Sequence, residues 1–467
     1  MTPALNAAEE PAPGARAVVV GGGLAGSSAA LELADRGWDV TLLETRPRLG
    51  GAAYSFRRDD LTIDTGQHVL LRCYTAYREL LDRAGAAAQV PVQDRLDIPV
   101  LTRDGSVLHL RRTPGLPAPL HLLRALGGYS VLGLAERAAA ARAMLALRRL
   151  DPDDPALDRQ TLGSWLRAHG QGPRAVEVLW GLITVAALNI DVEHASLGLA
   201  VRVFRDGLLD DARAGDVAVP VVPLAELHDG AVRRLLERSG VRCRTGARVA
   251  RVDHDPATHA FSVRTTDEDT PADAVVVAVP HRQAARIVPE AACPDRAAWA
   301  GLGSSAIVNV HLHLDRRVLP MPFAAGLDAD VPWLFDRTAA AGCRNGQYLA
   351  VSVSAADALL ERTNADIASA TTEALRRVLP AARDARVLDC FVTREPHATF
   401  EQRAGSASPR PSAAPRLPGL ALAGAWTATG WPDTLEGAVR SGRTAAELLD
   451  APGVGVRTHT GRKVLTT

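Results

Sequence analysis

Lysine is almost missing from this chain of 467 residues. Lys463, close to the C-terminus, is the single lysine, so the other 52 of the 53 basic residues are arginine. P-loop enzymes, protein kinases, pyridoxal phosphate enzymes and Ser-x-x-Lys hydrolases all need a lysine within the folded body of the protein. The sequence therefore excludes these four classes of site.

Net charge, paired cysteines and long apolar runs are lacking as well. The 53 basic residues balance 53 acidic ones, which leaves no overall charge for binding nucleic acid. Five widely spaced cysteines form no C-x-x-C pair, so we expect reduced thiols in a cytoplasmic protein. No apolar run reaches the ~18 residues of a membrane-spanning helix. Residues 1–15 resemble a flexible leader rather than a signal peptide, and residues 451–467 a flexible tail.

The clearest structural signal is a βαβ unit over residues 15–44. An apolar strand ends at Val20, a helix with apolar periodicity begins at Leu24 and stops at Gly37, and a second strand covers residues 40–43. This order of elements is typical of an α/β protein with a parallel sheet.

The turn inside this unit carries a G-x-G-x-x-G pattern formed by Gly21, Gly23 and Gly26. The first glycine permits a tight turn, the second lets the backbone approach a pyrophosphate, and the third lets the helix pack closely on the strand. The first helical residues, Leu24 and Ala25, then present free N–H groups to the phosphates. The pattern predicts a dinucleotide site.

Glu44 ends the second strand, eighteen residues after Gly26, where its carboxylate can accept hydrogen bonds from a ribose. A nucleotide site alone does not separate NAD from FAD. The chain continues as Glu-Thr-Arg-Pro-Arg-Leu-Gly-Gly, and this loop resembles the flavin-containing amine oxidase and phytoene desaturase superfamily. The resemblance implies FAD as the cofactor, with Arg48, Gly50 and Gly51 along its diphosphate and ribityl chain.

Within that superfamily, the chain is most similar to the hydroxysqualene dehydroxylases of hopanoid-making bacteria, also called squalene-associated FAD-dependent desaturases. The similarity rests on residues 64–74, 180–189 and 424–442, and it extends over roughly residues 18–449. It implies reductive removal of the hydroxyl group of hydroxysqualene, an apolar C30 isoprenoid. The further FAD contacts that we predict are Gly66, Val249, Gly424, Thr434 and Leu435. The last two begin a helix whose N–H groups would face the flavin pyrimidine.

Two other functions stay open at this point. One is a carotenoid or phytoene desaturase or isomerase, which would run the flavin in the oxidative direction. The other is a non-catalytic prenyl-binding escort protein, because the family usually has an acidic residue after the glycine of the C-terminal motif and this chain has Ala425. Amine oxidation is not expected, since amine oxidases of the superfamily generally use a lysine beside the flavin.

Three side chains are candidates for catalysis. His68 lies in a glycine turn that the resemblance places near the flavin, and we predict it as a donor for the departing hydroxyl, against the alternative of a surface histidine. Trp431 is predicted either to wall the flavin or only to pack. Asp433 is predicted either as an acid or, more simply, as the N-cap of the last helix. His311 and His313 share one strand face without a third ligand, so no metal site is predicted.

The segment Leu116–Leu150 is rich in leucine and alanine and has five arginines against one glutamate. One interpretation is a helix pair that touches an anionic membrane surface; the other is a core-facing helix with solvated arginines. An isoprenoid substrate favours membrane contact, so we expect a cytoplasmic protein with peripheral contact to the membrane. The sequence leaves the oligomeric state open.

These observations predict an α/β fold in which a Rossmann-like FAD-binding domain is assembled from discontinuous segments. The second domain should combine a mixed sheet with helices and bind the substrate. We place the FAD-binding domain at residues 16–95, 215–290 and 415–450, and the substrate domain at residues 96–214 and 291–414.

Overall fold

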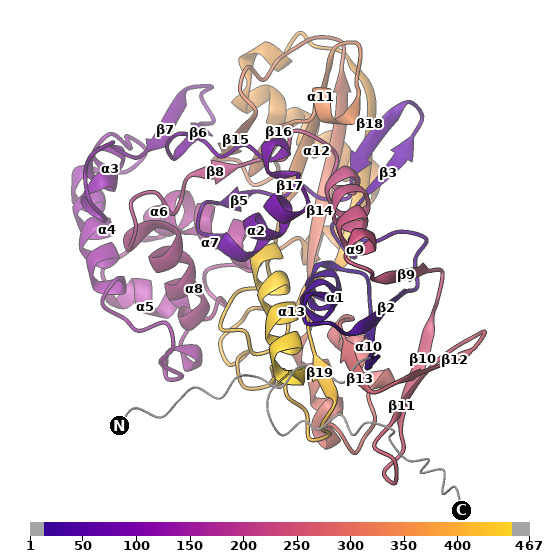
Figure 1. The fold of residues 1–467 in the computed structure, drawn as a ribbon. Helices are drawn as coiled ribbons and strands as arrows, with labels where there is room; N and C mark the ends of the chain where they lie inside the picture. The colour runs from indigo at the N-terminus through magenta and orange to yellow at the C-terminus, as the bar shows by residue number, and fades with distance from the viewer. Residues whose placement is uncertain (1–13, 451–467) are drawn as a thin grey trace, which may run out of the picture.

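The computed structural model describes residues 14–450, so the predicted leader up to residue 13, the predicted tail and Lys463 lie outside the described residues. A five-stranded parallel sheet forms one layer, in the order β19-β13-β1-β2-β9 (Figure 1). Its strands are β1 (Arg16–Val20), β2 (Asp39–Glu44), β9 (Arg242–Thr245), β13 (Ala274–Val277) and β19 (Leu420–Leu422). Val276 and its neighbours in β13 are fully buried, which is why this strand has a continuous apolar sequence.

The predicted βαβ unit is confirmed. Helix α1 spans Leu24–Asp35, and Gly37 follows its end with a φ of +86°. Helix α13 (Leu435–Leu449) lies beside α1 (Figure 1), and Gly442 makes this closeness possible, because a Cβ there would lie 2.2 Å from the carbonyl oxygen of Ala25. The two helices therefore cover the sheet as one packed pair.

A seven-stranded sheet forms the second layer, in the order β18-β14-β17-β16-β15-β6-β7. Its strands are β6 (Asp97–Leu101), β7 (Val107–Arg111), β14 (Ser305–Leu314), β15 (Phe323–Gly326), β16 (Trp333–Asp336), β17 (Gln347–Val353) and β18 (Val387–Thr399). Only β15 and β6 pair in parallel, so the sheet is mixed, as predicted. Strands β15 and β16 are short and were not expected from the sequence.

Helix α12 (Asn364–Val378) covers one face of this sheet through an apolar cluster that includes Val308, Val310 and Leu312 of β14. Because side chains alternate along a strand, the odd-numbered residues of β14 face the opposite way. That opposite face lies toward the turn after β4 (Leu61–Asp64), where Asn309 donates a hydrogen bond to the carbonyl oxygen of Thr65 at 2.9 Å. The two layers meet at this turn.

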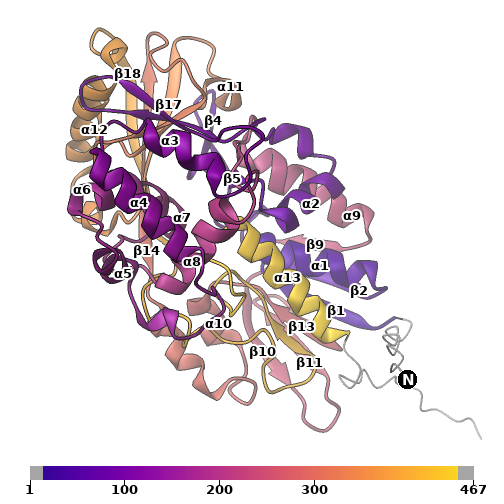
Figure 2. The same ribbon diagram turned by 90° about the vertical axis from the view of Figure 1, so that its left-hand side faces the viewer.

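The segment over residues 116–209 is largely helical (Figure 2). It contains α3 (Leu123–Gly127), α4 (Leu134–Leu147), α5 (Leu162–Ala168), α6 (Pro173–Ala175), α7 (Gly181–Leu188), α8 (Leu197–Phe204) and the π-helical turns Val176–Trp180 and Arg205–Leu209. Trp180 and Phe204 pack edge to face at 5.1 Å in its core.

Smaller elements complete the chain. They are the hairpin β3 (Ser55–Arg58) and β4, the pair β5 (Leu70–Leu71) and β8 (Val217–Ala218), the small sheet β10 (Val249–His254), β11 (Phe261–Thr265) and β12 (Asp269–Ala272), and the helices α2 (Thr75–Arg83), α9 (Arg233–Arg238), α10 (His281–Ile287) and α11 (Thr338–Ala341). The residue boundaries that we predicted for the two domains stay a prediction.

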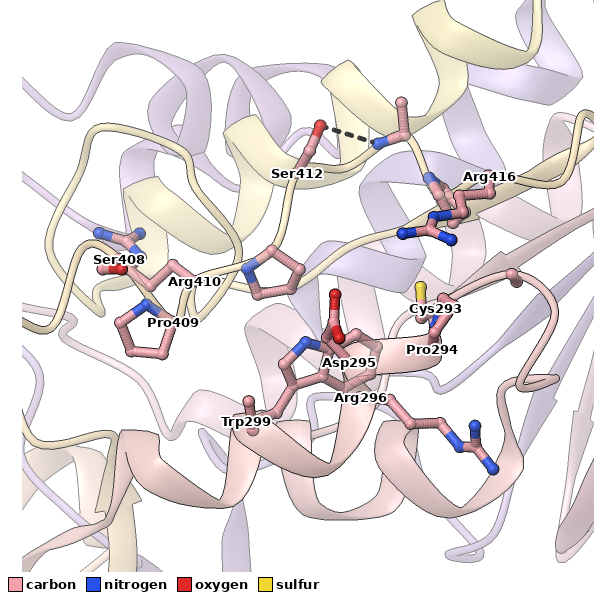
Figure 3. Close-up of a pocket in the computed structure, with 15 residues that line it drawn as sticks. Cys293, Pro294, Asp295, Arg296, Trp299, Ser408, Pro409, Arg410, Ser412 and Arg416 are labelled. Atoms are coloured by element: carbon pink, nitrogen blue, oxygen red, sulfur yellow. Dashed lines mark hydrogen bonds between the residues drawn. The ribbon is translucent and has the colours of Figure 1, made fainter.

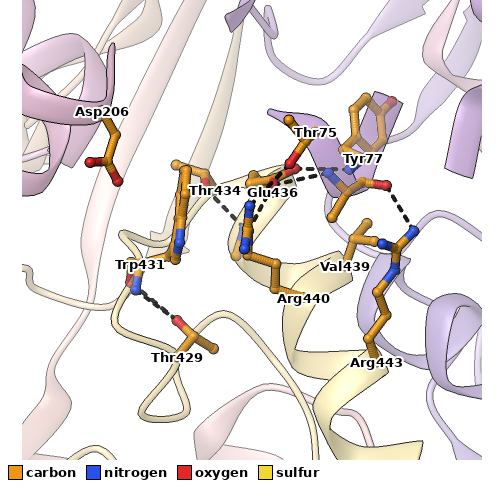
Figure 4. A network of polar contacts seen from close by, with 12 residues as sticks. Thr75, Tyr77, Asp206, Thr429, Trp431, Thr434, Glu436, Val439, Arg440 and Arg443 are labelled. Carbon is orange, nitrogen blue, oxygen red and sulfur yellow. Dashed lines mark hydrogen bonds and ion pairs between the residues drawn. The ribbon is translucent and has the colours of Figure 1, made fainter. Parts of the chain in front are cut away.

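Glu436 ties α13 to α2 (Figure 4). Its side chain is fully buried, and its two carboxylate oxygens accept hydrogen bonds from the backbone N–H groups of Ala76 and Tyr77 at 3.0 and 2.8 Å. Arg440, one turn later in α13, lies 2.7 Å from the same carboxylate. Glu436 therefore caps the N-terminus of α2 from another helix.

Replacing Glu436 by alanine should lower the free energy of unfolding by about 2 to 4 kcal/mol, because two buried N–H groups lose their acceptor. Chemical denaturation followed by circular dichroism would measure the change. Glu447→Ala, at an exposed position of the same helix, is the control and should change stability by less than about 0.5 kcal/mol. Equal stability of the two variants would contradict the capping role.

Candidate functional site

The glycine turn between β1 and α1 has the tight geometry that the sequence predicts. Gly21 has a φ of +108°, and a Cβ there would lie 2.4 Å from the carbonyl oxygen of Ala278. A Cβ at Gly26 would lie only 1.8 Å from the carbonyl oxygen of Gly21. Both glycines are therefore required by the packing of helix, strand and turn.

Gly23 differs from these two glycines, because a Cβ there would touch nothing closer than the Cα of Gly51, at 3.7 Å. Gly23 is also the N-cap of α1 and offers no side chain to the helix, so the N–H groups of Leu24 and Ala25 have no cap within the described chain. Open space beside unpaired N–H groups and a positive helix end fits a phosphate. The turn is thus able to hold the pyrophosphate of a dinucleotide.

Glu44, at the end of β2, connects the turn to the next loop. One carboxylate oxygen accepts a hydrogen bond from the backbone N–H group of Gly22 at 2.7 Å. The other accepts a hydrogen bond from the backbone N–H group of Arg46 at 2.8 Å. A carboxylate can accept about four hydrogen bonds. Glu44 therefore retains acceptor capacity for the ribose hydroxyl that we predicted it to bind.

The loop after Glu44 is held by two arginines rather than one. Arg46 and Arg48 each donate a hydrogen bond to the carbonyl oxygen of Gly51 at 3.1 Å. The Arg48 guanidinium lies 3.3 Å from the centre of the Tyr54 ring, and burial lowers its pKa. We predicted Arg48 and missed Arg46, although its position two residues after Glu44 is an equally visible signal. Gly51 itself has a φ of +60°.

His228 contacts this loop through its side chain and was also not predicted as a site residue from the sequence. Its Nδ1 lies 2.8 Å from the carbonyl oxygen of Ala53, and its Nε2 lies 2.7 Å from the hydroxyl of Tyr77. Burial lowers the pKa of His228 to about 4, so the ring is neutral at pH 7. A Cβ at Gly50 would lie 3.1 Å from the Cβ of His228, which explains why glycine is needed there.

The turn that contains Gly66 is fixed between the two sheets. Asp64 and Arg337 form a buried ion pair at 3.0 Å, and Asp64 also accepts hydrogen bonds from the Ser55 hydroxyl and the Leu224 N–H group. Gly66 lies next to Asn309, since a Cβ there would be 3.7 Å from the Asn309 amide nitrogen. The structure therefore brings Gly66 and His68 to the junction of the two layers.

His68 is half-buried, and burial lowers its pKa. Its Nδ1 lies 3.1 Å from the carbonyl oxygen of Gly66. Because a carbonyl can only accept, Nδ1 carries the proton of the neutral ring, and Nε2 is left as an acceptor. A role as proton donor would require His68 to be protonated against the effect of burial; its catalytic role stays a prediction.

The C-terminal loop over residues 424–431 is organised by Arg410, which is 7% exposed. Its guanidinium donates hydrogen bonds to the carbonyl oxygens of Ala425, Thr427 and Trp431. Burial lowers the pKa of Arg410 to about 10. Gly424 has a φ of +141° and donates its N–H group to Ser441 at 2.8 Å. Arg410 thus holds this loop through its backbone carbonyl groups, and the Ala425 side chain within the loop is buried.

Asp433 does not cap the last helix, so that interpretation is wrong. The N-cap is Thr434, whose hydroxyl accepts a hydrogen bond from the N–H group of Gly437 at 3.1 Å, and α13 begins at Leu435. Asp433 instead accepts a hydrogen bond from the N–H group of Phe400 at 3.0 Å. Burial raises its pKa to about 6. Its role as an acid stays a prediction.

Trp431 lies beside Arg440 of α13 (Figure 4). The Arg440 guanidinium lies 4.5 Å from the centre of its ring, and the Tyr74 ring meets it edge to face at 6.3 Å. Val249, the other predicted contact away from the main motifs, begins β10 and is half-buried against an apolar cluster. Neither arrangement tests the roles in flavin binding that we predicted, which stay predictions.

His311 serves the interior of the second sheet. Its Nδ1 lies 2.7 Å from the Tyr348 hydroxyl, its Nε2 lies 3.0 Å from the Thr393 hydroxyl, and burial lowers its pKa to about 3. His313 lies at the edge, 2.8 Å from the carbonyl oxygen of Asn345. Within residues 14–450, no group of three or more metal-ligating side chains occurs.

A surface cavity of about 280 Å³ lies between the turns around Trp299 and the segment Ser408–Arg416 (Figure 3). Arg410 lines it from one side, while Asp295 and Arg296 line it from the other. None of the residues that we predicted for the cofactor or for catalysis lines it. The cavity is therefore formed beside the segment that holds Arg410, and it is separate from the glycine turn.

A glycine turn with free helix N–H groups, a ribose-binding glutamate and a basic Gly-Gly loop fit a dinucleotide that contains flavin. A model of the flavin-containing amine oxidoreductases matches residues 24–449. The chain belongs to this family. FAD is its cofactor. When bound, FAD supplies two-electron redox chemistry, and Glu44, Arg48 and the glycine backbone would hold it.

Individual relatives extend this result. The hydroxysqualene dehydroxylase of Rhodopseudomonas palustris is 29% identical, over 93% of this chain and 98% of the relative. The zeta-carotene desaturase of Synechocystis is 25% identical, over 93% and 97%. Among solved structures, wild-type putrescine oxidase bound to putrescine superposes with a TM-score of 0.69 at 19% identity, covering 93% of this chain and 98% of that one. The structural likeness shows a shared fold.

Gly23→Ala should abolish or strongly weaken FAD binding while the apoprotein keeps its fold, because the added methyl group meets open space in the protein but would meet the pyrophosphate. Flavin absorbance of the purified protein and its circular dichroism would measure the two effects. Gly26→Ala is the contrasting variant and should destabilise the fold itself, since its Cβ collides with the Gly21 carbonyl. A Gly23→Ala protein with full FAD content would disprove the pyrophosphate position.

Proposed function

We propose that this protein is an FAD-dependent hydroxysqualene dehydroxylase, which removes the hydroxyl group of hydroxysqualene to give squalene in hopanoid biosynthesis. The similarity to the curated hydroxysqualene dehydroxylase over nearly the full length of both chains carries this proposal. The more distant carotene desaturases support the runner-up, a desaturase that uses the same flavin in the oxidative direction. The intact glycine turn and Glu44 favour an enzyme over the escort protein.

The reaction replaces a C–O bond by a C–H bond at an allylic carbon. Bound reduced FAD supplies the hydride, and the protein has to bind the apolar chain, exclude water and deliver a proton to the departing hydroxyl. The absence of lysine from residues 14–450 leaves arginine as the only permanently charged cation there. Such a site suits a substrate without ionic groups.

An apolar cluster, which we call the Phe335 cluster, supplies apolar side chains for contact with the isoprenoid chain. Its buried members are Leu96, Val217, Phe323 and Phe335, and half-buried side chains pack against them, including Val69, Leu71, Leu122, Leu208 and Trp333. Val69 follows His68 directly, while Leu122 lies between the exposed Leu120 and Leu123. The cluster thus connects the Gly66 turn with the outer surface at α3.

An anaerobic single-turnover experiment tests the proposed reaction. The flavin of the purified protein is reduced, hydroxysqualene is added, and flavin absorbance and squalene formation are followed together. We expect reoxidation of the flavin with stoichiometric squalene. Flavin that stays reduced in the presence of hydroxysqualene would reject the dehydroxylase and favour the desaturase direction, and a protein without flavin would favour the escort function.

We further propose that the protein is cytoplasmic and touches the membrane surface through α3, the segment before it and the exposed face of α4. Five of the eight large apolar side chains that are exposed on the described chain lie between residues 116 and 145: Leu116, Leu120, Leu123, Leu134 and Leu145. Leu134 is 80% exposed. Figure 2 shows α3 and α4 on the outside of the molecule. No helix among residues 14–450 has the length and apolarity needed to cross a membrane.

Charge supports an anionic bilayer as the partner of this surface. Arg124 is exposed beside Leu123, and Arg142 lies on the same face of α4 as Leu145. The exposed Arg149 follows the end of α4. The opposite face of α4, with Ala143 and Leu147, is buried. One face of helix α4 is therefore packed on the core, as the core-facing interpretation predicts. The other face exposes leucine and arginine side chains, which is the pattern of a helix that docks on lipid.

Changing Leu120, Leu123 and Leu134 together to serine should remove the protein from vesicles that contain phosphatidylglycerol. Each inserted leucine contributes on the order of 1 kcal/mol, so partitioning should weaken about 100-fold. Flotation with vesicles measures the bound fraction. The matched control changes Val107, Val221 and Leu388, the other exposed large apolar residues, to serine and should float like the wild type. Failure of the wild type to float would reject membrane contact.

A further inference from the structure

The face of the second sheet that is turned away from α12 carries polar side chains in two neighbouring strands. Asn309 of β14 lies directly opposite Thr393 of β18, so both side chains are on this face. Asn309 donates to the carbonyl oxygen of Thr65 at 2.9 Å, and the Thr393 hydroxyl lies 3.4 Å from the same oxygen. These contacts fix this part of the face against the Gly66 turn.

Glu395 lies on the same face, two residues further along β18 and directly opposite Ile307. Two residues along a strand correspond to about 7 Å. Its side chain is half-buried, and the charges that act on it are Arg46 and Arg48 of the loop after Glu44. Glu395 therefore lies on the sheet face that contacts the Gly66 turn, within reach of the charges of Arg46 and Arg48 in the loop after Glu44, and we predict both segments to line the flavin.

The surroundings keep a proton on Glu395 more readily than on an ordinary glutamate. Burial raises its pKa, although the charges of Arg46 and Arg48 act in the opposite direction. Arg394 and Pro396, its neighbours in the strand, have their side chains on the other face, and Arg394 is engaged there by Asn364. His397, two residues later in β18, lies beyond Glu395 where the strand pairing shifts register.

The two groups predicted from the sequence are less suited to giving a proton. The neutral His68 ring uses its one N–H toward Gly66 and has only an acceptor at Nε2. The Asp433 carboxylate already accepts a hydrogen bond from the N–H group of Phe400, and the charge of Arg410 acts on it. Glu395 has no such backbone partner among the hydrogen bonds of residues 14–450.

We propose that Glu395 is the proton donor for the departing hydroxyl group. In this step the allylic carbon gains a hydride from the reduced cofactor while its C–O bond breaks, and the oxygen leaves with the Glu395 proton as water. The cofactor is oxidised by two electrons and the carbon is reduced, so no further reactant is needed. Solvent returns the proton to the Glu395 carboxylate. The inference rests on the proposed dehydroxylase function and names the residue that completes it.

Glu395→Gln keeps the size of the side chain but removes its acid. In the anaerobic single-turnover experiment, the variant should reoxidise flavin and form squalene about 100-fold more slowly, the lower end of what general acids contribute. The wild-type rate should fall as pH rises through the raised pKa of Glu395, and this pH dependence should disappear in the variant. Glu395→Asp, which keeps an acid, should recover part of the rate. Flavin absorbance of each purified variant should match that of the wild type.

Glu290→Gln provides the control, because Glu290 is 78% exposed and pairs with Arg296 away from the flavin-lining segments. A Glu395→Gln protein with wild-type rate and pH profile would overturn the proposal while leaving the dehydroxylase function intact. Loss of FAD from the variant would overturn it too, since Glu395 would then hold the cofactor. If the wild type itself leaves hydroxysqualene unchanged, the function fails first, and the role of Glu395 fails with it.

Discussion

The buried ion pair between Asp64 and Arg337 is the constraint on which the site depends. Asp64 ends β4, whereas Arg337 follows β16 in the second sheet, and both side chains are almost fully buried. Breaking such a pair on one side typically costs about 3 to 5 kcal/mol, because the remaining charge stays buried. The pair therefore holds the Gly66 turn in one position between the two layers. A cofactor bound along the glycine turn and a substrate bound over the second sheet can meet only where these layers are fixed together.

Much of the nucleotide half could be predicted from the sequence because its signals are local. The turn from Gly21 to Gly26 and the strand that ends at Glu44 both follow from spacing and periodicity within a few residues. Their physical reasons are visible in the structure, where glycine is the only residue that fits at Gly21 and Gly26. The resemblance to a known family supplied the cofactor and the reaction, which spacing alone does not distinguish.

The residues that were missed act across the chain. Glu436 caps a helix 360 residues away in sequence, Arg410 binds carbonyl groups of a loop, and the role proposed for Glu395 depends on the pairing of β18 with β14. No sequence pattern within a single segment predicts such contacts. For Asp433 the local pattern was misleading, because it predicted a helix cap. In the structure Asp433 accepts a hydrogen bond from the N–H group of Phe400, and its neighbour Thr434 is the N-cap. Tertiary contacts decided each of these cases.

Desolvation gives the site its chemical character. Burial opposes charge of either sign, so it lowers the pKa values of His68, His228 and His311 and raises those of Glu395 and Asp433. The imidazoles are thereby kept as neutral hydrogen-bonding groups, and the two carboxyl groups keep their protons to higher pH than ordinary carboxyl groups do. A site with these properties can protonate a departing hydroxyl without exposing an apolar chain to fixed charge. In the proposed reaction, the burial that suits an apolar chain also favours a carboxyl group over a histidine as the acid.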